Sequence, residues 1–169
     1  MPDSPLLVTA SHHQYSLEWA QFDPDAMDFT NGNGLVWVSR GRIVVKTGLD
    51  SGDLPVQFGV HDHVPPLDLD SWDEVVEVSA EIDGDRVFVY MPDGILVGEV
   101  DLPRGAGAYR LRFHARGRDA GWDAEFIDAD EGDELVEQHM ILIWRAVAAD
   151  ETVFKLTDQV GARNRSLRQ

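Results

Sequence analysis

Apolar and polar residues alternate along the middle of the chain. Between residues 74 and 82 every second side chain is apolar from Val76 to Ile82, and the positions between them are polar. Residues 109–116 repeat the pattern, starting with Tyr109, and carry arginine or His114 at the alternate positions. A period of two places successive side chains on opposite faces of a strand. The pattern therefore predicts half-buried β-strands with an apolar face toward a core and a charged face outward.

Turn-forming residues separate these segments. Asp83-Gly84-Asp85 and Pro92-Asp93-Gly94 lie between alternating runs, and an Asp-Gly pair in that position is a strong hairpin signal. Further strand-like segments occur at residues 13–19, 35–46 and 54–60. About eight to ten short strands with frequent turns are typical of an antiparallel β-sandwich, or of a flattened barrel. We therefore expect an all-β fold.

One segment leaves two alternatives open. Residues 136–144 are apolar on both faces around Met140 to Trp144. Such a run fits a central strand or a buried helix, and its β-branched residues favour the strand slightly. Three longer connections are predicted at residues 23–34, 64–72 and 117–133, and the last two are acidic.

Length and composition set the domain organisation. The chain has 169 residues, of which 43% are hydrophobic, enough for one core of ordinary size. We expect one β-sandwich domain over residues 1–160 and a flexible basic tail over residues 161–169. The chain has no cysteine, no apolar run of membrane-spanning length and no basic signal-peptide region at its start. These features favour a cytoplasmic protein that does not contact membranes.

Charge is distributed in blocks. The formal net charge is −17, every charge between Asp50 and Asp85 is negative, and residues 119–137 contain no lysine or arginine. Between these blocks, residues 104–118 carry only basic charges. Direct binding of nucleic acid is disfavoured, because phosphate binding requires cationic surface. The acidic blocks suit a basic partner protein, or simply keep the chain in solution.

The arginines at positions 110, 112 and 116 share the predicted outward face of one strand. Cross-strand ion pairs with Glu77, Glu81 or Glu99 would explain them. An anion-binding patch is the alternative.

His61-Asp62-His63 is a candidate metal site. In an extended strand, residues two apart point to the same side, so His61 and His63 have the arrangement of a His-x-His metal pair. A third ligand for a divalent metal would have to come from another histidine or from Asp68 or Asp70. The alternative is an exposed strand end with two ordinary histidines, and otherwise no cofactor is expected. The chain has no nucleophile elbow, phosphate loop, dinucleotide fingerprint or zinc-protease motif, so no catalytic residue is assigned.

Two stretches of the chain carry a resemblance to a known family. They are His12-His13-Gln14-Tyr15-Ser16-Leu17, and the Leu-Pro, Tyr-Arg-Leu-Arg and His-Ala-Arg-Gly-Arg elements between Leu102 and Arg118. In these stretches the chain resembles the family of competence protein J, the inhibitor partner of the DNA-entry nuclease, and a group of uncharacterised bacterial proteins. The resemblance implies an all-β, non-enzymatic protein that occludes a cationic nucleic-acid-binding site.

The leading hypothesis is therefore an acidic interaction protein of the nuclease-inhibitor or immunity type, whose partner is a basic protein such as a nuclease or toxin. The second is a small-ligand or metal-binding β-domain that uses His61 and His63. Carboxylates of the two acidic connections would form the partner-binding surface, with a tryptophan as anchor. The predicted partner-binding residues are Asp68, Asp70, Trp72, Asp73, Glu74, Trp122, Asp123, Glu125, Asp130, Glu131, Asp133 and Glu134.

Overall fold

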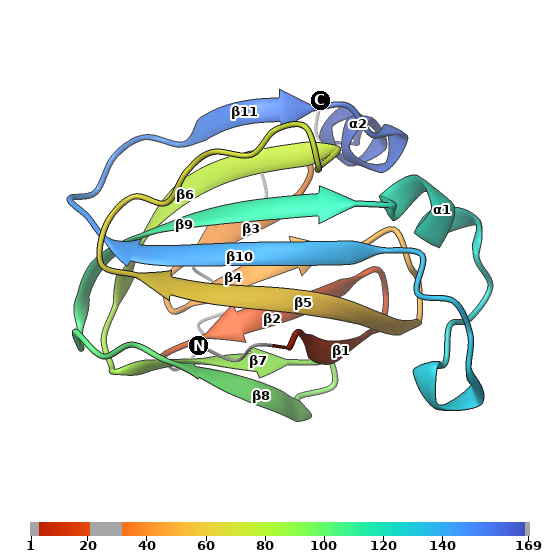
Figure 1. Cartoon of the computed structure of the whole chain (residues 1–169), viewed down its shortest axis with the longest axis horizontal. Helices are drawn as coiled ribbons and strands as arrows, with labels where there is room; N and C mark the ends of the chain where they lie inside the picture. Colours follow the sequence, from red (N-terminus) through yellow and green to blue (C-terminus); the bar gives the residue numbers. More distant parts are fainter. Residues whose placement is uncertain (1–3, 21–31, 168–169) are drawn as a thin grey trace.

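The computed structural model describes residues 4–20 and 32–167. Two β-sheets face each other and enclose the apolar core (Figure 1). Most of the predicted connection at residues 23–34 lies outside the described residues. Among the described residues, no helix combines the length and the apolar character needed to cross a bilayer.

The first sheet has six strands and the second has five. The order in the six-stranded sheet is β1 (Leu6–Ala10), β5 (Gly52–His61), β10 (Gln138–Arg145), β9 (Gly107–Arg116), β6 (Glu74–Ile82) and β11 (Thr152–Leu156). The order in the five-stranded sheet is β3 (Val36–Ser39), β4 (Arg42–Lys46), β2 (Gln14–Glu18), β7 (Arg86–Tyr90) and β8 (Leu96–Asp101). Three short helical elements complete the described fold: α1 (Arg118–Asp123), η2 (Ala129–Glu131) and α2 (Gln159–Ser166).

The predicted all-β sandwich is confirmed, in the form of two open sheets and not a barrel. The ambiguous segment at residues 136–144 forms strand β10 from Gln138 onward, between β5 and β9. Both edges of this strand are paired, and its inward and outward residues from Ile141 to Trp144 are at most 9% exposed, which explains why its sequence does not alternate. One pairing differs from the antiparallel prediction, because β10 runs parallel to β5.

The core is formed by the inward positions that the alternation predicted. Strand β6 contributes every second residue from Val76 to Ile82, and β9 contributes Leu111 and Phe113, all at most 8% exposed. Tyr15 and Leu17 of β2 face them from the other sheet and are fully buried. The period-two pattern therefore fixed the orientation of these strands as well as their existence.

The charged face of β9 is directed outward, as predicted, but it is covered. Arg110 and Arg112 are 5% and 3% exposed, because two stretches of chain lie over them. Arg112 donates to the carbonyl oxygens of Pro65 and Pro66 at 3.1 and 3.2 Å. Arg110 donates to the carbonyl oxygens of Ala149 and Asp150 at 2.9 and 2.7 Å.

Glu77 forms an ion pair with each of the two covered arginines. One of its carboxylate oxygens accepts from Nε of Arg110 at 2.8 Å, and the other accepts from Nε of Arg112 at 3.1 Å. The predicted cross-strand ion pairing is therefore confirmed for Arg110 and Arg112, with Glu77 as the partner, whereas Arg116 donates to the side chain of Gln138. Arg110 and Arg112 form no free anion patch, since both side chains are buried and paired with Glu77.

Residues 159–166 form helix α2, where the sequence predicted a flexible tail from residue 161 onward. The Asp158 side chain caps the helix by accepting from the N–H of Gly161 at 2.7 Å. Arg165 and Asn164 donate to the carbonyl oxygens of Asn33 and Gly34, at 3.0 and 3.1 Å. The tail prediction was wrong for this helix, because it weighed the basic composition and overlooked the N-cap.

Substitution of Glu77 tests the covered ion pair. We expect Glu77→Gln to lower the free energy of unfolding by about 2–3 kcal/mol, because it leaves two buried arginines without a counter-charge while keeping one acceptor. Urea unfolding followed by tryptophan fluorescence measures the change. Glu81→Gln is the matched control on the exposed end of the same strand, with an expected change within about 0.5 kcal/mol. Equal midpoints for the two variants would show that the pair does not stabilise the fold.

Candidate functional site

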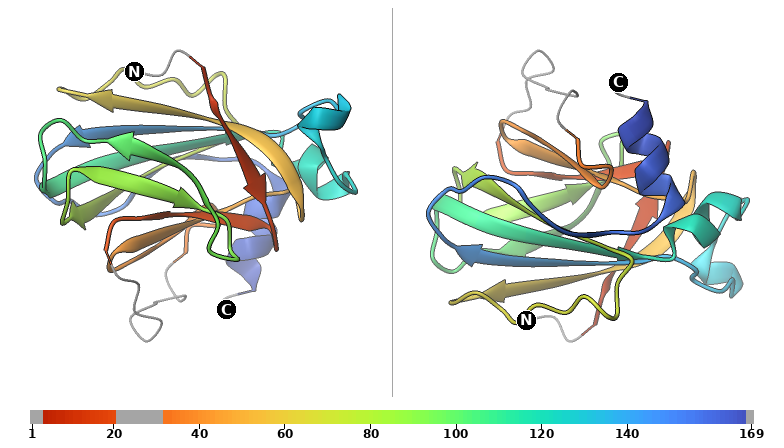
Figure 2. Two further views of the ribbon diagram at one scale, coloured as in Figure 1. Left: turned by 90° about the horizontal axis from the view of Figure 1, so that it is seen from below. Right: turned by 90° about the horizontal axis from the view of Figure 1, so that it is seen from above.

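The candidate site is the segment between β9 and β10, residues 117–134, which we call the end segment. It contains α1 and η2 and lies at the same end of the sandwich as α2 (Figures 1 and 2). It carries most of the predicted partner-binding residues. Their usefulness as a binding surface depends on how firmly the segment is held.

Arg118, at the start of α1, fixes the end segment to the sandwich. Its side chain is fully buried and makes two parallel bonds to the carboxylate of Asp158, at 2.7 and 2.8 Å. Its remaining nitrogen donates to the carbonyl oxygens of Gly34 and Lys46, at 2.9 and 3.2 Å. One guanidinium therefore joins α1, the start of α2 and the chain on both sides of the β3–β4 hairpin.

Glu74 lies buried beside this pair. Its Oε1 accepts from the N–H of Asp158 at 2.9 Å and lies 4.0 Å from Arg118. Burial, together with the neighbouring carboxylate of Asp158, raises the pKa of Glu74 to about 8. Burial also opposes ionisation of Asp158, but the bonds and charge of Arg118 outweigh it and hold the pKa of Asp158 below its usual value. The cluster therefore carries one ion pair and one neutral carboxyl group near neutral pH.

A second buried network lies under α1. The Glu137 carboxylate accepts from the N–H groups of Gly48 and Leu49, at distances between 2.9 and 3.1 Å, and pairs with Nε2 of His139 at 2.8 Å. The other ring nitrogen of His139 lies 2.8 Å from the Tyr15 hydroxyl. A Cβ on Gly48 would lie 1.8 Å from the Arg118 carbonyl oxygen, so α1 packs closely enough here to require glycine. All these side chains are sealed from solvent, which assigns them a structural role.

Trp122 of α1 is the exposed aromatic of the site. It is 39% exposed, and its ring stacks on His13 with a centroid distance of 4.6 Å and an interplanar angle of 21°. The guanidinium of Arg163, on α2, lies 4.1 Å from the Trp122 ring centroid. These contacts hold the indole at one orientation while leaving part of its surface free.

His13 reaches Trp122 from an unusual turn. His12 and His13 link β1 to β2 with φ angles of 54° and 59°. This left-handed region favours glycine and asparagine, and it costs other residues about 1–2 kcal/mol each. The conformation is supported because the His13 N–H donates to the Asp50 carbonyl oxygen and its Nδ1 lies 3.0 Å from the Gly48 carbonyl oxygen.

Exposed carboxylates follow Trp122 along the end segment. The exposed residues that the sequence predicted here are Trp122, Asp123, Glu125, Asp130, Glu131, Asp133 and Glu134. Phe126, which is 58% exposed, adds a second aromatic surface. Asp53 anchors the far part of the segment by accepting from the Ala129 N–H at 3.0 Å. A segment that combines exposed aromatic side chains with several exposed carboxylates is suited to bind a cationic protein surface.

The other predicted partner residues belong to residues 62–73, which we call the covering connector, and to Glu74. Figure 1 shows this connector running along the six-stranded sheet between β5 and β6. Asp68 and Asp70 are exposed, and hydrogen bonds from the Ser71 hydroxyl and N–H lower the pKa of Asp68. Asp73 is half-buried and accepts from the Gly117 N–H at 3.0 Å.

Two predicted partner residues are not on the surface. Glu74 is fully buried in the Arg118 cluster, and Trp72 is only 8% exposed. The Trp72 ring packs against His114 and under the guanidinium of Arg116, with centroid distances of 5.4 and 4.7 Å. Burial lowers the pKa of His114 to about 4, so this ring is neutral beneath the connector. Placing Glu74 in an exposed acidic surface was wrong, and Trp72 covers the sheet.

The two acidic segments meet at the Asp73–Gly117 hydrogen bond and then diverge. The covering connector continues over β6 and β11, where Lys155 donates to the Leu69 carbonyl oxygen at 2.7 Å. The end segment continues toward β5, where Ile127 forms a bridge with Gly52. We therefore take the end segment, and not the whole predicted set, as the candidate site.

The predicted metal pair has no support from its surroundings. His61 is half-buried and His63 is exposed. Within the part of the chain that the structure describes, no group of three or more histidines and carboxylates is arranged to hold a metal ion. In the end segment, the carboxylate of Asp128 accepts from the N–H of Asp130, and that of Asp133 accepts from the N–H of Asp128. These local bonds explain the spacing of the two aspartates along the chain.

Some residues of the site were not singled out from the sequence. Trp122 contacts Arg163 and His13, and Arg118 pairs with Asp158. In each case the two partners lie far apart in the sequence. The N-cap aspartate before Gln159 was a usable signal for α2. Nothing local in the sequence signals the pairing of Arg118 with Asp158.

The raised pKa of Glu74 gives a pH test. Because the folded state keeps a proton that the unfolded chain releases above about pH 4.5, stability should fall as pH rises toward 8. Glu74→Gln removes the titrating group, so the free energy of unfolding of the wild type relative to this variant should fall by at least about 1 kcal/mol between pH 5 and pH 8.5. Urea unfolding across this range measures it. Asp70→Asn, in the exposed connector, should follow the wild type. A pH-independent difference between wild type and Glu74→Gln would contradict the assignment.

Comparison with known proteins addresses the fold. No protein-family model matches the chain, and no curated protein sequence matches it. Two solved structures do match. One is ComJ from Bacillus subtilis, described as an inhibitor of the DNA-degrading activity of NucA. It has 15% sequence identity and a TM-score of 0.56, with 84% of this chain and 95% of ComJ covered.

The other is the protein of crocagin biosynthetic gene J. It has 13% sequence identity and a TM-score of 0.57, with 85% of this chain and 97% of that protein covered. At such identities the likeness concerns the fold and not individual side chains. The chain therefore shares the two-sheet fold of ComJ and of the crocagin gene J protein.

Proposed function

We propose that this protein is a non-enzymatic inhibitor of a DNA-degrading nuclease. The observation that carries the proposal is the shared fold with ComJ, itself an inhibitor of a nuclease, over 84% of the chain. The physical argument is independent of that likeness. A nuclease groove is cationic because it receives phosphates, and a protein of net charge −17 is attracted to such a surface at long range.

The end segment is the part of the described surface best suited to make this contact. Trp122 presents a partly exposed indole that is already held by His13 and Arg163. A pre-oriented aromatic loses little side-chain freedom on binding, which is a property of interface hot spots. The exposed carboxylates of the end segment, beginning with Asp123 and Glu125, would take the place of DNA phosphates against the basic groups of the partner.

The partner is accordingly a nuclease with a basic substrate groove. Asp68 and Asp70 of the covering connector extend the negative potential beyond the end segment without adjoining it. They would speed the encounter and contribute less to the bound state, because exposed charges outside a contact act mainly on the association rate.

Inhibition of DNA degradation is the direct test. We expect the purified protein to suppress the degradation of linear duplex DNA by an extract of the cells that produce it. Trp122→Ala should weaken inhibition at least tenfold, as loss of an interface hot spot of about 2 kcal/mol would. An extract whose DNA degradation is unaffected at any concentration of wild-type protein would contradict the proposed function.

A charge-matched pair of double variants locates the surface. Asp123→Asn/Glu125→Gln removes two carboxylates from the end segment. Glu81→Gln/Asp83→Asn removes two exposed carboxylates at the C-terminal end of strand β6. We expect the first double variant to raise the concentration needed for half inhibition about tenfold, and the second to change it less than about threefold. Equal effects of the two pairs would show that net charge matters and that the end segment is not the contact. Far-ultraviolet circular dichroism confirms that both variants are folded.

A further inference from the structure

A cavity of about 680 Å³ opens between the sheets at the end opposite α1 and α2. It lies between β5 of one sheet and β8 of the other, with the chain before β1 and the β8–β9 turn closing its sides. Small-molecule sites commonly have volumes of about 300–1,000 Å³. This cavity is remote from the end segment, so contact of the end segment with a nuclease would not account for it.

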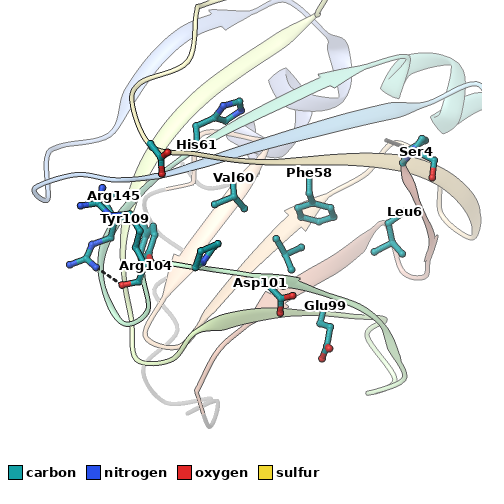
Figure 3. A pocket seen from close by; sticks show the side chains of 14 residues that line it. Ser4, Leu6, Phe58, Val60, His61, Glu99, Asp101, Arg104, Tyr109 and Arg145 are labelled. Atoms are coloured by element: carbon teal, nitrogen blue, oxygen red, sulfur yellow. Dashed lines mark hydrogen bonds between the residues drawn. The ribbon is translucent and has the colours of Figure 1, made fainter. Parts of the chain in front are cut away.

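The interior of the cavity is apolar. Figure 3 shows Phe58 and Val60 pointing from β5 into it, with Leu6 on the side of β1. Val100 and Tyr109 complete this lining. The His61 ring points away from the cavity (Figure 3). It therefore does not interrupt the apolar surface that is available to the chain of a ligand.

Two arginines gather at one end of the cavity. Figure 3 shows Arg104, Tyr109 and Arg145 together there. Arg145 donates to the Arg104 carbonyl oxygen at 3.0 Å, and its guanidinium lies 5.5 Å from the Tyr109 ring centroid. Among the described residues, no carboxylate forms an ion pair with either arginine. In a chain of net charge −17, two neighbouring arginines without a carboxylate partner form a local site for an anion.

The carboxylates of the lining limit the charge of that anion. Glu99 and Asp101 share Arg86 with Asp85, at 3.2, 3.9 and 3.6 Å, so their charges are only partly balanced. Asp62 also lines the cavity and forms no ion pair within the described part of the chain. Because the lining holds these three carboxylates beside Arg104 and Arg145, it disfavours a dianion such as a phosphate monoester more strongly than a group with a single negative charge.

We propose that this cavity binds a small amphipathic carboxylate, with its apolar chain against Phe58, Val60 and Val100 and its carboxylate at Arg104 and Arg145. Arginine is suited to this role because its planar group donates two parallel hydrogen bonds to a carboxylate. The inference does not depend on nuclease inhibition, since it concerns different residues at the other end of the molecule.

Decanoate, below its micellar concentration, is the probe. Methyl NMR spectra of the full chain should show shifts for Val60 and Val100 on addition of decanoate, and isothermal titration calorimetry should give its affinity. Decylammonium, with the same chain and the opposite charge, should bind at least tenfold more weakly. Absence of decanoate binding, equal binding of the two probes, or shifts confined to residues outside the cavity would each overturn the proposal.

Arginine variants test the carboxylate end. Arg104→Gln and Arg145→Gln should each weaken decanoate binding about tenfold, which corresponds to the loss of one charge-assisted contact. Arg40→Gln, in the exposed β3–β4 turn, removes the same charge elsewhere and should change the affinity less than twofold. Arg104 is exposed, so its variant preserves the packing of Arg145 on Tyr109. Unchanged affinity in both Arg104→Gln and Arg145→Gln would overturn the proposed position of the carboxylate.

Discussion

The buried guanidinium of Arg118 is the interaction on which the candidate site depends. A charge sealed from water is tolerated only if its donors are satisfied. Asp158 and the carbonyl oxygens of Gly34 and Lys46 provide partners for all three nitrogens of Arg118. Because these partners come from the start of α2 and from both sides of the β3–β4 hairpin, satisfying one charge fixes several segments relative to one another. α1, which begins at Arg118, takes its position from them.

This arrangement has a consequence for binding. Trp122 lies four residues after Arg118 in α1, and Arg163 lies five residues after the Asp158 cap of α2. The ion pair between Arg118 and Asp158 therefore brings Trp122 and Arg163 together at the surface. An exposed tryptophan on an unsupported loop would lose conformational freedom on binding a partner, whereas this one has already lost it in folding. The buried network that contains Arg118, Asp158 and the neutral Glu74 therefore also holds Trp122 in position to contact a partner.

The sequence predicts this fold to the extent that information is local. Alternation identifies the strands and their inward residues, and it places Glu77 among three possible cross-strand partners of the β9 arginines, of which the register selects Glu77 for Arg110 and Arg112. The direction in which two strands pair, and the burial of a residue under a distant segment, are not local properties. The parallel pairing of β5 with β10 joins strands separated by a long stretch of chain, and the burial of Glu74 depends on helix α2 packing over it. A carboxylate within an acidic run looks like surface until its distant partners are known. For the same reason, Trp122 could be selected as an exposed aromatic, while its contacts with His13 and Arg163 could not.

The low identity to ComJ and to the crocagin gene J protein, 15% and 13%, limits what the shared fold can transfer. A sandwich core accepts many apolar residues of suitable size at each inward position, so a fold persists while its sequence changes. A partner surface is less tolerant, because its charges and aromatic anchors must match another protein at defined places. Fold similarity at this level therefore establishes the two-sheet architecture, and the exposed residues of this chain must specify any partner. The two ends of the sandwich differ in this respect. At the end near α1 and α2, buried ion pairs support a segment with an exposed tryptophan and carboxylates, and at the other end Arg104 and Arg145, which form no ion pair within the described residues, border the cavity. Since these chemistries suit ligands of opposite charge at separate places, the two proposed ligands, a cationic protein and an anionic small molecule, would not compete with each other.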